Sequence, residues 1–355
     1  MTEALEIKTT ITEESKLPHV DFDNLTFGHT YSDHMFIADF EDGDWKNSRI
    51  IPFRDLRISP ANATLHYAQS IFEGMKAHKS EDGEILLFRP EANAQRMIRS
   101  AERMCMPPVP QELFLGAVEQ LVKLDKDWIP DRPGTSLYIR PFQFATDPYI
   151  GIRPSDTYSF MVITGPVGGY YSEPVKVKIE QHFTRAARGG VGAAKTAGNY
   201  AASIYPAKLA QDQGYHQLIW TDGQTHEYIE EAGTMNIMFV LNDTLITPAP
   251  SDSVLPGITR ESALILARDW GLNVEERPIK VTEIIDAIEK NELSEAFGIG
   301  TGASISQIKT IGFDGVDYEL PSVETRTISN RLLEALTKIK TGATEDKFDW
   351  IRRIG

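Results

Sequence analysis

A single lysine, Lys195, follows a cluster of glycines and precedes a segment with helical periodicity. Gly189, Gly190 and Gly192 would let the backbone approach a ligand closely, because glycine has no Cβ. The apolar spacing from about residue 201 to residue 213 predicts a helix, so Lys195 is expected on a short structured turn. Three uses of this arrangement are open: a phosphate cradle, a Schiff base formed by the lysine amine, or tight packing without chemistry.

The phosphate-cradle interpretation compares residues 189–196 with the nucleotide-binding pattern G-x-x-x-x-G-K-[ST]. The segment departs from the pattern at one residue, Ala194, which stands where a glycine lets successive N–H groups wrap a phosphate. Residues 184–188 are also not the hydrophobic strand that such a loop follows. A nucleotide-binding protein therefore stays an alternative, but the pattern does not favour it.

The Schiff-base interpretation needs a phosphate site, an acid near a pyridine nitrogen and hydrogen-bond donors for the ring. Glu230 and Glu231 stand beside a small-residue turn before a strand-like run, and one of the two is expected in a solvated loop. Residues 255–259 open a predicted helix, whose N–H groups and dipole favour an anion. Residues 298–304 form a second glycine-rich turn with a hydroxyl.

The elements that would position these residues alternate between strands and helices, which predicts a mixed α and β fold. The clearest strands are expected at 34–40, 85–88, 136–140, 158–164, 175–180, 217–220 and 236–240. Helices are expected at about 90–105, 110–128, 260–270 and 323–339. Clustered Gly and Pro predict a linker at 165–174, between a small domain at 1–164, which begins with a loose arm at 1–24, and a large domain at 175–355.

Composition excludes several classes of protein. A formal net charge of -15 argues against binding to nucleic acid or to an anionic membrane, since both require a basic surface. The only cysteine is Cys105, so neither a disulfide framework nor a Cys-rich zinc site is expected. The 8 histidines show no paired ligand spacing, and no metal site is predicted. The sequence shows neither a signal peptide nor a membrane-spanning run, which predicts a cytoplasmic protein.

Five segments in order resemble the branched-chain amino acid aminotransferases, which are pyridoxal-phosphate enzymes of fold type IV. These segments are Phe72–Lys76, Gly189–Tyr200, Glu231–Asn236, Leu255–Arg260 and Gly300–Gly302. The resemblance covers roughly residues 25–340, and its most specific parts are G-N-Y after the lysine and E-A-G-T-M-N. It implies a two-domain fold like that of D-amino acid aminotransferase, with mixed α and β structure, and a large domain that binds the cofactor.

The resemblance also implies roles in binding pyridoxal 5'-phosphate. Lys195 would join the cofactor aldehyde and later shuttle the proton, Glu231 would bond the pyridine nitrogen, and Tyr200 would bond O3′. The residues implied for the phosphate are Arg96, Ile258, Thr259 and Thr301. Periodicity alone would place Arg96 on the solvated face of its helix.

Substrate contacts follow from the same resemblance. The implied carboxylate contacts are Tyr138, Arg140 and the N–H groups of Thr301 and Gly302. The implied side-chain pocket consists of Phe27, Tyr67, Phe72, Gly74, Ile150, Ile152, Thr234 and Met235, some of them contributed across a homodimer. Mammalian members have a redox-sensitive C-x-x-C after the last glycine turn, where this chain has Ala303 and Ser306, so that thiol regulation is not expected.

The implied reaction moves the amino group of leucine, isoleucine or valine to 2-oxoglutarate, giving branched 2-oxo acids and L-glutamate, and suits amino-acid biosynthesis. D-amino acid aminotransferase and aminodeoxychorismate lyase share the fold and are the alternatives within it. Both usually lack the long N-terminal region and the E-A-G-T-M-N form of the motif.

Overall fold

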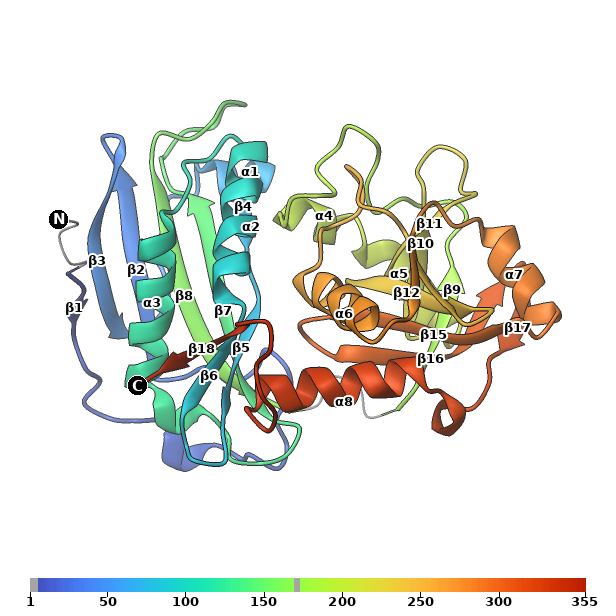
Figure 1. Cartoon of the computed structure of the whole chain (residues 1–355). Helices are drawn as coiled ribbons and strands as arrows, with labels where there is room; N and C mark the ends of the chain where they lie inside the picture. The colour runs from blue at the N-terminus through green and yellow to red at the C-terminus, as the bar shows by residue number, and fades with distance from the viewer. Residues whose placement is uncertain (1–5, 169–172) are drawn as a thin grey trace. The chain divides into compact units, whose positions relative to one another are not determined.

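The computed structural model describes residues 6–168 and 173–355, whose strands form two separate sheets (Figure 1). Each sheet belongs to its own compact unit. The first unit takes its described residues from Met1–Tyr170, Ala194–Ala197 and Lys338–Gly355. The second takes its described residues from Tyr171–Ala193 and Gly198–Thr337. The mixed α and β fold expected from the sequence is present.

The sheet of the first unit has the order β1-β3-β2-β8-β7-β5-β6-β18, with β4 also paired to β7. Its strands are β1 (Lys8–Thr9), β2 (His34–Glu41), β3 (Asp44–Pro52), β4 (Ser70–Phe72), β5 (Met75–Lys79), β6 (Ile85–Phe88), β7 (Ser136–Ala145), β8 (Tyr158–Val167) and β18 (Ile351–Ile354). All pairings except β1 with β3 are antiparallel.

Strand β7 separates the core of this unit from its polar face. Leu137 and Ile139 are fully buried in a cluster with apolar residues of the helices α2 (Pro90–Arg103) and α3 (Gln111–Leu124). Tyr138 and Arg140 alternate with them and are only partly buried, because successive side chains of a strand point to opposite faces. The unit also contains the short helix α1 (Ala63–Tyr67).

The sheet of the second unit closes into a barrel. It has the order β11-β10-β9-β16-β15-β12-β13-β14, and β11 pairs with β12 as well as with β10, which joins the ends of a six-strand ring. The strands are β9 (Val175–Ile179), β10 (Gln217–Thr221), β11 (Ile229–Ala232), β12 (Met235–Leu241), β13 (Thr244–Thr247), β14 (Asn273–Glu276), β15 (Leu293–Gly300), β16 (Ser304–Phe313) and β17 (Val316–Glu319). The helices are α4 (Ala197–Ala201), α5 (Ile204–Asp212), α6 (Ile258–Asp269), α7 (Val281–Glu289) and α8 (Ile328–Lys340), whose last residues belong to the first unit.

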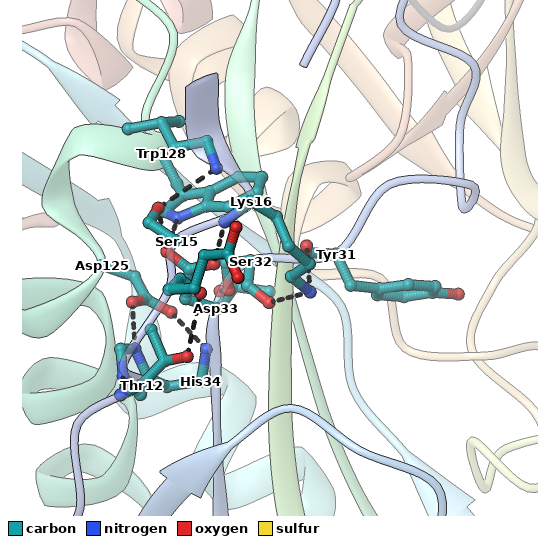
Figure 2. Close-up of polar contacts among 12 residues, drawn as sticks. Thr12, Ser15, Lys16, Tyr31, Ser32, Asp33, His34, Asp125 and Trp128 are labelled. Atoms are coloured by element: carbon teal, nitrogen blue, oxygen red, sulfur yellow. Dashed lines mark hydrogen bonds and ion pairs between the residues drawn. The ribbon is translucent and has the colours of Figure 1, made fainter. Parts of the chain in front are cut away.

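The N-terminal segment, expected as a loose arm over residues 1–24, is held in its described part by buried polar groups (Figure 2). The carboxylate of Asp33 accepts hydrogen bonds from Ser15 Oγ at 2.6 Å and from the Lys16 N–H at 2.9 Å. The Thr12 N–H donates to His34 Nε2 at 3.0 Å, so His34 Nδ1 bears the proton that it donates to Asp125 at 2.6 Å. The prediction of a loose arm is therefore wrong for residues 12–16, because its polar residues find partners that periodicity does not reveal.

Two further boundaries differ from the sequence expectation. Residues 165–167 of the expected linker continue β8 and pair with residues 136–138. A Cβ at Gly165 would overlap the carbonyl of Thr30, so this glycine serves close packing rather than a flexible connection. Residues 169–172 of the expected linker lie outside the described residues. At the other end of the chain, β18 pairs with β6 and joins residues 351–354 to the first unit rather than to the second.

Within the described ranges, no helix has the length and apolar character that crossing a membrane requires.

Candidate active site

Lys195 is fixed by contacts within the first unit. Its N–H donates to Ser100 Oγ at 3.0 Å, and its carbonyl accepts from the Phe72 N–H at 2.9 Å. The next residue, Thr196, forms an isolated antiparallel bridge with Ile71. The Lys195 Nζ lies 4.9 Å from the centroid of the Phe72 ring. Both sides of the lysine backbone are thus bonded, which places the amine on a rigid turn as the sequence predicts.

A buried carboxylate follows Phe72 directly. Glu73 is 0% exposed, and its two oxygens accept from Nε and Nη2 of Arg96, each at 2.7 Å. Asn93 Nδ2 also donates to Glu73 Oε2, at 2.8 Å. Burial by itself would raise the pKa of Glu73, but the charge and hydrogen bonds of Arg96, the charge of Lys195 and the bond from Asn93 hold it below its ordinary value. Glu73 is therefore a carboxylate at neutral pH.

The helix α2 supplies three of these partners from one face. Asn93, Arg96 and Ser100 are spaced by three and four residues, so their side chains lie along one stripe of the helix. All three are buried. Arg96 is thus not on a solvated face, which corrects the interpretation from periodicity alone.

Beside Lys195, a row of aromatic and cationic groups covers the polar face of β7. The Arg140 guanidinium lies 4.6 Å from the Phe72 ring centroid, and its Nη2 donates to the Tyr138 hydroxyl at 2.8 Å. Phe27 packs edge-on against Tyr138 with centroids 4.9 Å apart. A Cβ at Gly74 would overlap the Tyr138 hydroxyl, so glycine at this position leaves room for that hydroxyl. Arg140 Nε is buried without a protein partner in the described structure, which suits a cation that awaits a carboxylate.

Three other residues expected in the substrate pocket are exposed on the first unit. Tyr67, Ile150 and Ile152 have exposed fractions of 43%, 58% and 94%. Ile150 and Ile152 lie in the loop between β7 and β8, which Asp147 holds through bonds from Arg153 and Ser155. They are not packed into the core of their own unit.

In the second unit, Glu231 is 3% exposed on strand β11. Its Oε1 accepts from the Leu255 N–H at 2.7 Å and from Asn236 Nδ2 at 3.3 Å. Its Oε2 lies 3.0 Å from Arg185 Nε in an ion pair. A buried carboxylate with a cationic partner and two donors is a suitable group to face a protonated ring nitrogen.

The sequence predicts that either Glu230 or Glu231 lies in a solvated loop. That prediction is wrong, because both carboxylates are buried on β11. Ser253 Oγ donates to Glu230 Oε1, and Glu230 Oε2 is buried without a partner in the part of the chain described. Burial raises the pKa of Glu230, although the bond from Ser253 and the charge of Arg185 oppose the shift. The barrel closure by β11 explains the burial, since this pairing is not visible locally in the sequence.

The start of helix α6 lies close to Asn236, which also contacts Glu231. Its N-cap, Gly257, provides no side-chain cap, and Ile258 and Thr259 in its first turn are buried. A Cβ at Gly257 would overlap Asn236 Oδ1. Glycine therefore lets the helix end approach the strand that follows Glu231.

The remaining predicted residues of the second unit lie at a strand start, in turns and in a short helix. Met235 begins β12 and pairs with Ala232, and its side chain lies against Gly298 and Gly300 of β15. Thr301 and Gly302 form the turn between β15 and β16 and are half-buried, while Thr234 is exposed. Tyr200 lies in helix α4 and is half-buried.

The glycine loop before Lys195 uses its N–H groups within the protein. Gly190 donates to the Ala187 carbonyl and Ala193 to the Asp252 carbonyl, both at 2.9 Å, and the Gly189 N–H meets the Asp252 carboxylate at 3.3 Å. A Cβ at Gly192 would overlap Ser253. An acidic partner and internally bonded N–H groups do not suit a nucleotide phosphate. Gly190 and Gly192 serve close packing, and Gly189 adopts a positive φ.

Sequence reasoning gave no role to four residues that contact the predicted site: Asn93, Ser100, Arg185 and Asn236. Asn93 and Ser100 share the helical stripe of Arg96, which is a signal available from spacing. Arg185 and Glu231 are far apart in the sequence, so no local pattern predicts their contact. No group of three or more His, Cys, Asp or Glu side chains that could hold a metal ion occurs among the residues described.

Comparison with known proteins gives a family match over most of the chain. A family model described as amino-transferase class IV matches residues 70–311. The chain is 44% identical over 344 residues to branched-chain-amino-acid aminotransferase 2 of Bacillus subtilis strain 168, covering 96% of this chain and 95% of the relative. It is also 44% identical over 335 residues to branched-chain-amino-acid transaminase 1 of the same organism, covering 93% and 94%.

Solved structures of branched-chain aminotransferases are also similar to this chain. The branched-chain amino acid aminotransferase of Escherichia coli is 26% identical with a TM-score of 0.72, covering 91% of this chain and 99% of that one. A branched-chain aminotransferase of Thermoproteus uzoniensis, solved with norvaline, is 25% identical with a TM-score of 0.74, covering 90% and 100%.

Proposed function

Because the chain belongs to the class IV aminotransferase family, and within it to the branched-chain-amino-acid aminotransferases, we propose that it transfers the amino group of leucine, isoleucine or valine to 2-oxoglutarate. The observation that carries the proposal is the setting of Lys195. Its backbone N–H and carbonyl are both hydrogen-bonded, and its amine lies over the Phe72 ring. The residue after Phe72 is Glu73, which forms a buried ion pair with Arg96. The enzymes of this family depend on pyridoxal phosphate.

The described residues fit that cofactor. Glu231 is a buried carboxylate in an ion pair, which suits a partner for a protonated ring nitrogen. The first turn of α6 lacks a side-chain cap, which suits a phosphate. The residues proposed to hold the cofactor are Lys195, Arg96, Tyr200, Glu231, Ile258, Thr259 and Thr301. When bound, the cofactor supplies a protonated ring that withdraws electrons from the substrate Cα.

The chain's own contribution to the chemistry centres on the Lys195 amine. With the cofactor bound, Lys195 Nζ would take the proton from the substrate Cα and deliver it to the cofactor carbon C4′ within the same half-reaction, and the second half-reaction would run these two transfers in reverse. General-base help of this kind typically raises the rate by about 10²–10⁴-fold. The bonds to Ser100 and Phe72 keep the amine in place, so little reorganisation is needed at each transfer.

Substrate selection combines one polar contact with apolar walls. Arg140, whose Nε is buried without a protein partner in the described structure, and the Tyr138 hydroxyl are proposed to hold a carboxylate. Phe27 and Phe72 border them with apolar rings. A pocket of this kind accepts an aliphatic side chain in one half-reaction and, through Arg140, the second carboxylate of 2-oxoglutarate in the other.

Three finer features are proposed with this function. The first unit would act as the small domain and the barrel unit as the cofactor-binding domain. The chain would work as a homodimer, which the exposed Ile150 and Ile152 support, and it would reside in the cytoplasm.

The test is a transamination assay with a panel of L- and D-amino acids and 2-oxoglutarate. We expect L-leucine, L-isoleucine and L-valine to be the best donors, and we expect Lys195→Ala to lower turnover by at least about 10²–10⁴-fold. Lys208, an exposed lysine on helix α5, provides the control, and Lys208→Ala should keep full activity. Activity confined to D-amino acids, or full turnover by Lys195→Ala, would contradict the proposal.

A further inference from the structure

We propose that Glu73 is a positioning residue of the cofactor site, whose carboxylate fixes the orientation in which the Arg96 guanidinium meets the cofactor phosphate. The inference rests on the proposed function, because it takes Arg96 as a phosphate-binding residue. Its basis is a set of contacts that lie entirely within the first unit.

The first step is the geometry of the pair. Two N–H groups of Arg96, one on Nε and one on Nη2, donate to the two oxygens of Glu73 at 2.7 Å each. A bidentate contact of this kind fixes the plane of a guanidinium as well as its position. The other three N–H groups of Arg96 belong to Nη1 and Nη2, and these are the ones proposed to meet the phosphate.

The second step is that Glu73 is itself held, through its side chain and through its backbone. Asn93 Nδ2 donates to Glu73 Oε2 at 2.8 Å, and Asn93 lies one helical turn before Arg96 on α2. Glu73 also has its N–H bonded to the Pro141 carbonyl on β7 at 2.7 Å. Glu73 is therefore bonded both to strand β7 and to helix α2, which restricts the position of the carboxylate that orients Arg96.

The third step is the reason why the charged pair Glu73–Arg96 is buried beside apolar residues. Arg96 and Glu73 are 4% and 0% exposed, and the same helix contributes Ala94, Met97 and Ala101 to the hydrophobic cluster. Apolar residues of similar volume in place of a buried ion pair are often as stable or more stable, so stability alone does not account for this pair. Precise placement of a cation near Lys195 does account for it.

The fourth step is the charge state. Glu73 must be ionised to accept both bonds, and it is. Although burial opposes ionisation, the cations Arg96 and Lys195 together with the bond from Asn93 keep the pKa of Glu73 below its usual value. The pair thus stays intact over the neutral pH range in which an aminotransferase works.

The test compares two ligands that differ only in the phosphate, pyridoxal 5'-phosphate and pyridoxal. Full-length protein stripped of cofactor is titrated with each, and binding is followed by absorbance. In Glu73→Gln, the amide can accept only one of the two Arg96 bonds and turns an N–H group toward the other. We expect the dissociation constant for pyridoxal phosphate to rise about tenfold or more relative to that for pyridoxal.

A matched control comes from another buried carboxylate of the same unit. Asp125 is 3% exposed and bonded to His34, outside the proposed site. Asp125→Asn should lower the melting temperature but leave the ratio of the two dissociation constants unchanged. Should Glu73→Gln fail to fold, Asn93→Ala keeps the ion pair, loosens Glu73 and should move the ratio in the same direction by a smaller factor.

The outcomes separate this inference from the proposed function. If Glu73→Gln binds both ligands as wild type does, or weakens both by the same factor, Glu73 does not act through Arg96 and the inference is overturned. If the wild-type protein fails to bind pyridoxal phosphate, the proposed function itself is contradicted, and the inference falls with it.

Discussion

Lys340 is a buried amine at the end of helix α8, and it lies outside the proposed site. Burial, together with the positive charge of Lys76, lowers the pKa of Lys340 to about 7. The folded state therefore disfavours the protonated amine. This destabilisation has its full size below about pH 7, and it disappears as the pH rises to the ordinary lysine pKa of 10.5.

We expect Lys340→Met to stabilise the protein at pH 7 by an amount of the order of a few kcal/mol, because it removes this penalty. The gain should shrink steadily between pH 7 and pH 10. Urea unfolding at several pH values measures it, and Lys338→Met, which changes an exposed lysine two residues away, provides the control. A gain that does not depend on pH would show that protonation of Lys340 is not the cause.

At the same scale, the sequence predicted individual site residues unevenly. Lys195 could be proposed from the residues themselves, because glycines and a helix-like segment surround it. Arg96 could be proposed only through the resemblance, because helical periodicity places an arginine at its position on the solvated face. The partner of Arg96, Glu73, lies 23 positions away in the link between β4 and β5. A contact of this kind has no periodic signal, and the same holds for Arg185 and Glu231.

At the scale of elements, the strap formed by residues 12–16 depends on Asp33 (Figure 2). Its carboxylate accepts from Ser15, from the Lys16 N–H and, at 3.0 Å, from Trp128 Nε1. Burial alone would raise the pKa of Asp33, but these bonds and the charge of Lys16 hold it below its ordinary value. Its contribution to stability is therefore present above about pH 4 and lost as the pH falls further.

Asp33→Ala should destabilise the protein by about 2–4 kcal/mol, because it leaves the Trp128 indole and the strap without their acceptor. The strap should become accessible, so hydrogen exchange at the Lys16 amide should accelerate and proteases should cut near residues 12–16. Asp23→Ala removes an exposed carboxylate of the same N-terminal segment and should change neither property. Unchanged exchange in Asp33→Ala would mean that other contacts hold the strap.

The elements themselves could be predicted where their signals are local. The helix expected from residue 90 begins at Pro90, which suits a first helical position. The helix expected at 201–213 corresponds to α5, which begins only at Ile204, and a separate short helix, α4, ends at Ala201. Pro206 gives the reason, since its ring cannot pack against the carbonyl of residue 202 in a continuous helix. Closure of the barrel through β11 and β12 is a tertiary pairing and had no counterpart in the sequence pattern.

At the scale of the whole molecule, the first unit exposes several large apolar side chains. They are Leu56, Ile58, Leu65, Tyr67, Tyr149, Ile150 and Ile152. Exposed apolar residues of this kind are available for burial against a partner. They support the proposed homodimer, in which Ile150 and Ile152 would reach the site of the second copy.

A homodimer predicts a mass in solution of about twice the 39.7 kDa of the chain. Ile152→Asp places a charge on the most exposed of these side chains and should shift the protein toward monomer, with a loss of activity that follows the loss of dimer. Analytical ultracentrifugation over a concentration series measures this. Val316→Asp, at an exposed valine of the second unit, should leave the dimer intact. A wild-type monomer with full activity would contradict the assembly.

The most direct test of the whole account asks which amine meets the cofactor. Borohydride reduces the covalent link between pyridoxal phosphate and a lysine to a stable bond, and peptide mapping then identifies the residue. We predict that the label lies on Lys195 and on neither the half-buried Lys76 nor the buried Lys340, whose pKa values are lowered to about 8 and about 7. A label on another lysine, or no label in protein that is active with leucine and 2-oxoglutarate, would contradict it.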